Sequence, residues 1–256
     1  MLASLTAGAQ WTKPVPKGQP LVTSVECYLY NVDADGFLCG ANDWGTRASV
    51  VPMHGHKIWL EKFEYEGLAW DGKSYFIWNA IEDGGMAGQN GVMFMSDASN
   101  FWVDRAVDSD DAKQFGGFVF VEQGDNIYKM QPTASTDNFI GMKPVVNDNR
   151  LYLNVAEVEG GFAAEEFLTR WIFVSPTDYA AHKVNVERYE VALGLGKALE
   201  EVKAQSPSVD VAEVEAVYGN TNSTLEQLRD AYKQLARMAA SAESPVDVTA
   251  AFVTNP

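Results

Sequence analysis

The sequence is short of basic residues, and it contains no long apolar run. Lys and Arg together number 19 against 35 Asp and Glu, which gives a formal net charge of −16 at pH 7. A chain this acidic repels a polyanion instead of gaining from counterion release, so nucleic acid and an anionic membrane surface are disfavoured as partners. No stretch approaches the roughly 20 apolar residues of a membrane-spanning helix, so we expect no membrane insertion.

Cysteine is nearly absent, with only Cys27 and Cys39, and no Cys-x-x-Cys or Cys/His zinc pattern occurs. The two cysteines flank a predicted hairpin whose turn lies near Asp33–Gly36. If Tyr30 lies opposite Cys39, then Cys27 lies further along the partner strand, near Asn42, and a disulfide requires a twist or a bulge. The spacing therefore disfavours a disulfide, although export would permit one.

Histidine occurs three times, and two of the three flank Gly55. His54 and His56 place two imidazoles on one side of an extended segment, a geometry that metals use. No third ligand lies nearby in the sequence, so we expect an exposed polar loop and no metal site. The histidines have no evident nucleophile or carboxylate partner, so we also predict no catalytic residues, no enzymatic activity and no cofactor.

What the sequence does contain is a large apolar and aromatic fraction in a repeating order. Hydrophobic residues make up 46% and aromatic residues 12% of the 256 residues, enough to fill a substantial core. Aromatic-rich strands begin at Tyr28, Tyr75 and Tyr128, a period of about 50 residues. Each unit then has an apolar-x-Gly step and closes on a Trp; the steps end at Gly40, Gly88 and Gly141, and the closing residues are Trp59, Trp102 and Trp171. Three such units, separated by Gly, Asn and Asp turns, predict a β-trefoil.

The pattern becomes helical after Pro176, where apolar residues recur at three- and four-residue steps. A long helix is expected to end before Pro207, and a short one to stop at Gly219–Asn220. Ser223–Glu226 matches a capping box that begins a third helix. Each helix carries one apolar stripe, so the fold class is a β-trefoil followed by a small α-helical bundle.

Four parts follow from this organisation: a signal remnant and extended lead-in at 1–20, the trefoil at 21–176, the helical bundle at 177–243 and a linker at 244–256. Ala7–Ala9 has the small-x-small form of a signal cleavage site, which predicts export to the periplasm, the cell surface or the medium; a disordered N-terminus is the alternative. The last segment returns to β-type residues, which predicts a linker into a further C-terminal domain; a frayed terminus is the alternative.

Sugar binding has a recognisable requirement in side chains. A hexose presents an apolar face of C–H groups and a rim of hydroxyls, so its site needs an exposed aromatic ring beside planar acceptors and donors. The first repeat has the fullest set: Asp33 and Asp35 in the hairpin turn, and Asn42, Asp43 and Trp44 in the following loop. The alternative is that the two aspartates only build the turn and that Trp44 plugs the end of the barrel.

Two stretches of the first repeat resemble ricin-B-like β-trefoil modules. The first spans residues 28–38, which begin with Tyr-Leu-Tyr-Asn-Val and end with Gly-Phe-Leu, and the second is Asn-Asp-Trp-Gly-Thr at 42–46. The order of parts over about residues 20–256 is similar to the front of large exported proteins of host-associated bacteria. This resemblance implies a lectin-like module that binds a glycan. The family's Gln-x-Trp element departs in every repeat, with Lys57, Asn100 and Thr169 at the Gln position, which weakens that implication for at least two repeats. The Trp residues themselves are expected to stay in the core.

Two functions are therefore open. In the first, the trefoil is a carbohydrate-binding module of a larger exported protein, with Trp44 at its site. In the second, the trefoil and the helices form a structural or protein-interaction scaffold that presents a C-terminal domain. The altered Gln-x-Trp elements favour the scaffold, and the 42–46 loop favours sugar binding. An exposed Trp44 beside a polar pocket would support binding, and a buried Trp44 would support the scaffold.

Overall fold

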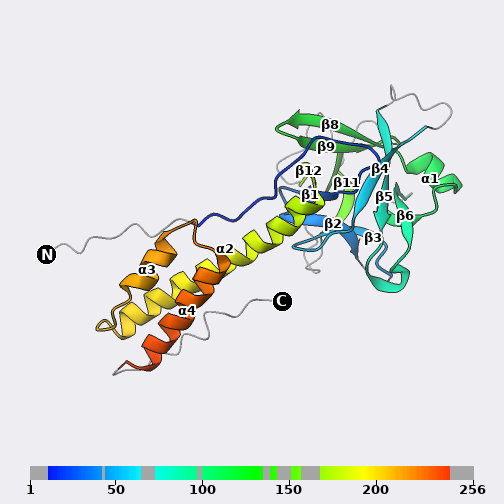
Figure 1. The fold of residues 1–256 in the computed structure, drawn as a ribbon. Helices are drawn as coiled ribbons and strands as arrows, with labels where there is room; N and C mark the ends of the chain where they lie inside the picture. Colours follow the sequence, from blue (N-terminus) through cyan, green and yellow to red (C-terminus); the bar gives the residue numbers. More distant parts are fainter. Residues whose placement is uncertain are drawn as a thin grey trace. The chain divides into compact units, whose positions relative to one another are not determined.

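A computed structural model of the chain describes residues 11–41, 44–64, 73–96, 100–134, 139–142, 151–156 and 168–242 (Figure 1). The predicted leader at 1–10 and the predicted linker at 244–256 lie outside these ranges. The strands are β1 (Tyr28–Asn31), β2 (Gly36–Ala41), β3 (Arg47–Val51), β4 (Ile58–Lys62), β5 (Ser74–Ala80), β6 (Asn90–Met95), β7 (Phe101–Arg105), β8 (Phe118–Gly124), β9 (Ile127–Pro132), β10 (Phe139–Met142), β11 (Leu151–Ala156) and β12 (Trp171–Val174). The helices are the 3₁₀ turn η1 (Gly84–Met86), α1 (Asp110–Phe115), α2 (Pro176–Gln205), α3 (Ala212–Gly219) and α4 (Leu225–Ala240).

Six of the strands form a closed antiparallel barrel. β1 pairs with β12, β12 with β9, β9 with β8, β8 with β5, and β5 with β4. The circuit closes between Cys27, which precedes β1, and Ile58 of β4, where two backbone hydrogen bonds measure 2.9 and 2.8 Å. Closure pairs the strand edges that an open sheet would leave exposed.

The other six strands form three hairpins: β2–β3, β6–β7 and β10–β11. β3 joins the hairpins to one another, because it pairs with β11 through Ser49 and with β7 through Arg47. A six-stranded barrel with three hairpins, four strands to a repeat, is the β-trefoil fold. The fold class predicted from the sequence period is confirmed.

The repeats begin where the sequence predicted, but the second repeat closes at a different residue. Tyr128 of β9 pairs with Trp171 of β12, and Tyr75 of β5 pairs in the same way with Phe118 of β8. Phe118, and not Trp102, therefore occupies the closing position of the second repeat. Trp102 lies one strand earlier, on β7, so the sequence pattern assigned it to the wrong strand.

The barrel interior is filled by apolar side chains from all three repeats. Its largest member is Trp171, which is fully buried and whose indole N–H donates to the Ile140 carbonyl at 3.4 Å. The expectation that all three closing tryptophans fill the core is correct only for Trp171. Trp59 and Trp102 are partly buried, and Trp59 stacks on Trp78 with the ring centroids 5.5 Å apart.

The two cysteines of the trefoil are free, buried thiols. The predicted hairpin register is wrong, because Tyr30 pairs with Phe37 instead of Cys39 across a tight turn. Cys39 lies opposite Ser49, with its sulfur 3.4 Å from the Ser49 hydroxyl oxygen. Burial raises the pKa of the Cys27 thiol to about 12 and that of Cys39 to about 11, which keeps both protonated at neutral pH.

The structure divides into two compact units, Val15–Ala180 and Met1–Pro14 with Ala181–Pro256. In the described part of the second unit, α3 and α4 pack on α2 around a shared apolar core that includes Leu195, Val214 and Leu228. The capping box of α4 lies one residue later than predicted, on Thr224 and Gln227. Among the described residues, no helix is both long and apolar enough to span a membrane.

Candidate functional site

The aspartates of the first hairpin turn are held by neighbouring groups. A carboxylate oxygen of Asp33 lies 2.5 Å from Nη2 of Arg170, and the Arg170 backbone N–H donates to the same carboxylate at 3.0 Å. Asp35 has a positive φ of 53° and accepts a 2.5 Å hydrogen bond from the Tyr30 hydroxyl. Asn31 closes the turn by accepting from the Ala34 N–H at 2.8 Å. The contacts of Asp33 tie the turn to Arg170, in the segment that leads into β12, and the other two hydrogen bonds lie within the hairpin.

Trp44 lies elsewhere on the first repeat and is 63% exposed. Its carbonyl accepts from the Met86 N–H at 3.1 Å, and its ring lies so close over Gly85 that a Cβ there would be 2.7 Å from a ring carbon. The loop is therefore attached to the η1 turn of the second repeat, and its indole is presented outward. The neighbouring predicted site residues, Asn42 and Asp43, lie outside the described residues.

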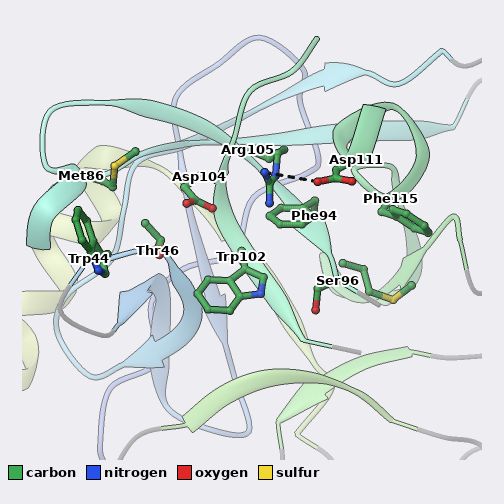
Figure 2. A pocket seen from close by; sticks show the side chains of 11 residues that line it. Trp44, Thr46, Met86, Phe94, Ser96, Trp102, Asp104, Arg105, Asp111 and Phe115 are labelled. Atoms are coloured by element: carbon green, nitrogen blue, oxygen red, sulfur yellow. Dashed lines mark ion pairs between the residues drawn. The ribbon is translucent and has the colours of Figure 1, made fainter. Parts of the chain in front are cut away.

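A pocket of about 630 Å³ opens beside Trp44. This volume lies within the range of small-molecule sites, about 300–1,000 Å³. The residues that line it are Trp44, Thr46, Met86, Phe94, Met95, Ser96, Trp102, Asp104, Arg105, Asp111 and Phe115. Figure 2 shows Trp44 and Met86 at one end, Arg105, Asp111 and Phe115 at the other, and Trp102 and Asp104 between them. Asp33 and Asp35 are not among the lining residues.

Strand alternation explains how β7 supplies the middle of the pocket. Side chains at alternate positions of a strand point to opposite faces of the sheet. Phe101 and Val103 are fully buried in the barrel core, so Trp102 and Asp104 face the other way, into the pocket. The β6–β7 pairing is irregular between Val92 and Phe94, and such bulges re-aim nearby side chains.

The far end of the pocket combines a cation, an aromatic ring and a carboxylate. The guanidinium carbon of Arg105 lies 4.3 Å from the centroid of the Phe94 ring, and Nη1 lies 3.5 Å from an Asp111 oxygen. Asp111 is in the first turn of α1, a short helix that Ser109 caps by accepting from the Ala112 N–H. Two contacts thus fix the direction of the guanidinium before any ligand arrives.

Asp104 supplies a second carboxylate between the two ends of the pocket (Figure 2). Partial burial raises its pKa above the ordinary value, because withdrawal from water disfavours the charged form. The pocket therefore offers aromatic rings, hydrogen-bond acceptors and a cationic donor on strands and a capped helix. This set is suited to binding a polar, hydroxyl-rich ligand.

Of the three predicted site residues that the structure describes, Asp33, Asp35 and Trp44, only Trp44 lines the pocket. Sequence reasoning missed Trp102, Asp104, Arg105 and Asp111 because it had assigned Trp102 to the core. The signal was present in the alternation of 101–104, Phe-Trp-Val-Asp, where one face of the strand is apolar and the other carries an indole and a carboxylate.

The His54–His56 segment also differs from its expectation. We predicted an exposed loop without a third ligand, but the His56 side chain is fully buried, and Asp83 approaches from the second repeat. The prediction failed because Asp83 is distant in sequence and is brought near only by the packing of the η1 turn on the first repeat.

No protein-family model and no curated protein matches the sequence. Solved structures match it distantly. A complex of lysenin with phosphocholine is 11% identical with a TM-score of 0.41, and the match covers 62% of this chain and 47% of that one. The binding domain of botulinum neurotoxin DC, in complex with rat synaptotagmin II, is 15% identical with a TM-score of 0.44, covering 65% and 47%.

The designed three-fold symmetric protein ThreeFoil is 14% identical with a TM-score of 0.36, and the match covers 59% of this chain and 98% of that one. The chain thus matches about half the length of the lysenin and neurotoxin chains. At these values the fold assignment rests on the strand pairings given above.

Proposed function

We propose that the β-trefoil unit is a non-catalytic, lectin-like carbohydrate-binding module whose site is the pocket beside Trp44. The observation that carries this proposal is an indole that is 63% exposed at the rim of a pocket of about 630 Å³, whose other lining groups include a second indole, two carboxylates and a guanidinium. An exposed Trp44 next to a polar pocket is the feature that separates sugar binding from a scaffold role, and it supports binding.

In this proposal, Trp44 and Trp102 provide the flat surfaces on which the C–H face of a sugar packs. Asp104 accepts hydrogen bonds from sugar hydroxyls, and Arg105 donates to ring or hydroxyl oxygens. Because Arg105 is already oriented by Phe94 and Asp111, little side-chain entropy is lost on binding. Charged hydrogen-bond partners contribute more than neutral ones, about 1.5–3 kcal/mol each.

The five predicted site residues have different roles in this proposal. Trp44 contacts the ligand, and Asn42 and Asp43, which precede it in the sequence, remain predicted site residues. Asp33 and Asp35 serve the hairpin turn, because their oxygens already accept from Arg170 and Tyr30. Export and attachment to a further C-terminal domain remain predictions; if both hold, the module keeps a larger exported protein close to glycan.

The test is a glycan-array screen of the full chain, with Trp44→Ala and Trp102→Ala measured in parallel after circular dichroism has confirmed their fold. We expect a defined glycan group to bind the wild type and binding to fall at least about tenfold in both variants, a loss of about 1.4 kcal/mol, since each variant removes a ring on which the sugar packs. Trp59→Ala is the matched control, because Trp59 is partly buried and is not a lining residue.

Two results would count against the proposal. Binding that persists in both folded pocket variants would move the site away from Trp44 and Trp102. No binding across a broad array would favour the scaffold function instead.

A further inference from the structure

Three potential metal ligands meet on the trefoil unit, on a different set of residues from the pocket. His54 and His56 follow β3, and Asp83 immediately precedes the η1 turn. One ligand atom from each of the three residues lies within 4.8 Å of the other two. Nε2 of His54 is 2.5 Å from an Asp83 oxygen, and Nε2 of His56 is 3.9 Å from the same oxygen. The three groups thus converge on one point from two repeats.

Backbone contacts hold this convergence. The His56 N–H donates to the Leu38 carbonyl at 2.9 Å, which anchors the histidine segment to the barrel. Gly45 and Gly84, both with a φ of +71°, let the loop of the first repeat touch the turn of the second. A Cβ at Gly45 would lie 2.0 Å from the Asp83 carbonyl oxygen, so only glycine allows this approach.

His56 is a buried side chain with unused hydrogen-bonding capacity. It is fully buried, and its Nδ1 has no hydrogen-bond partner among the described residues. Its Nε2 accepts only a long 3.3 Å contact from the Gly40 N–H, against the usual 2.9–3.0 Å. That contact places the proton on Nδ1 and occupies the single lone pair of Nε2, so a metal ion at Nε2 would replace this long hydrogen bond.

The donor set and spacing fit a transition metal. Two imidazole nitrogens and one carboxylate oxygen are ligands that zinc, copper and nickel accept, whereas magnesium and calcium prefer oxygen alone. Metal–ligand bonds of about 2.0–2.2 Å place tetrahedral ligand atoms roughly 3.3–3.6 Å apart. To reach this spacing, the 3.9 Å distance between His56 Nε2 and the Asp83 oxygen must shorten slightly, and the 2.5 Å distance between His54 Nε2 and that oxygen must lengthen. His54 and Asp83 can make these adjustments, because their side chains are 38% and 53% exposed.

We infer that His54, His56 and Asp83 form a binding site for one divalent transition-metal ion, such as zinc. His56 is the fixed, buried ligand, and His54 and Asp83 close on the ion from the solvent side. The fourth coordination position faces water, as it does in zinc sites with three protein ligands.

The test is isothermal titration of the full chain with ZnCl₂, using protein that carries no polyhistidine tag and has been stripped with a chelator. The wild type is expected to take up one equivalent. His54→Ala and Asp83→Asn should each weaken that binding at least about tenfold, because each removes one of three protein ligands. Both substitutions are at exposed side chains, which keeps the fold intact where a change at buried His56 would disturb it.

The matched control is Asp108→Asn. Asp108 is an exposed aspartate outside the cluster. This variant should bind zinc as the wild type does. As a second readout, Co²⁺ should give the visible absorption of a four-coordinate site in the wild type and lose it in His54→Ala. The inference is overturned if no single equivalent binds, or if its affinity is unchanged by both His54→Ala and Asp83→Asn.

Discussion

Trp102 and Trp171 occupy the same position in the sequence pattern of two repeats, yet they have opposite environments. Trp171 is fully buried at the centre of the barrel, whereas Trp102 is partly buried and lines the pocket. The difference follows from the strands that carry them. β12 is a barrel strand with β1 and β9 on its two sides, and β7 belongs to a hairpin and meets β3 only at Arg47. Whether a tryptophan lies in the core or lines the pocket therefore depends on the strand that carries it, and not on its position in the sequence repeat.

The largest expected effect is a loss of stability when the buried barrel tryptophan, Trp171, is replaced. Trp171→Ala should lower the free energy of unfolding of the trefoil unit by about 3–5 kcal/mol, because it leaves a cavity in a closed core. Urea unfolding monitored by circular dichroism measures the change. Trp102→Ala should cost clearly less, since its ring already faces the pocket. Equal losses in the two variants would contradict the distinction between the two environments.

The cysteines extend the comparison, because Cys27 belongs to the same core cluster as Trp171. Burial raises the pKa of Cys27 to about 12 and that of Cys39 to about 11, so little thiolate exists at pH 8. Alkylation by iodoacetamide should be at least about a hundredfold slower in the folded protein than in urea, since the thiolate is the reactive form. Intact mass after timed quenching reports the rates. Rapid modification of the folded protein would show that this part of the core opens readily.

On the pocket side, Asp104→Asn should separate binding from stability. Loss of the charged acceptor is expected to weaken binding of the array-identified glycan about tenfold, as measured by calorimetry. Stability should be unchanged or higher at pH 7. The pKa of Asp104 is raised in the folded state, so the wild type loses stability as pH rises above the ordinary value near 3.8, and asparagine removes that loss.

Asp108→Asn is the control for this prediction, because Asp108 is exposed and is not a lining residue. Asp108→Asn should change neither the glycan affinity nor the free energy of unfolding. A drop in the stability of Asp104→Asn without a change in affinity would give Asp104 a structural role instead.

The smallest expected effect is at the first hairpin turn. Asp33→Asn should reduce the free energy of unfolding by about 1 kcal/mol, because the Asp33 side chain is only 16% exposed and accepts from Arg170, whereas Arg170 is half exposed and asparagine keeps one acceptor oxygen. Glycan affinity should stay the same, which calorimetry would establish. A tenfold loss of affinity in a stable Asp33→Asn would return the turn aspartates to the binding site.

The sequence predicted the fold better than it predicted the site, and the reason is physical. The repeat starts at Tyr28, Tyr75 and Tyr128 recur because each is the first or second residue of a barrel strand, and that periodicity is local. The pocket and the histidine cluster depend on contacts between repeats: Trp44 on the η1 turn, and Asp83 beside His56. The contact between Asp83 and His56 depends on the close approach of Gly45 to Gly84. The spacing of residues in one sequence does not reveal which turn packs against which loop.

The most direct test follows the indole N–H signals of the seven tryptophans by NMR while the array-identified glycan is titrated into the full chain. Each signal is assigned by single substitution. The account predicts that the Trp44 and Trp102 signals shift saturably together and that the Trp171 signal stays in place. A saturable shift confined to other indoles, or to the backbone amides of the Asp33–Asp35 turn, would contradict it.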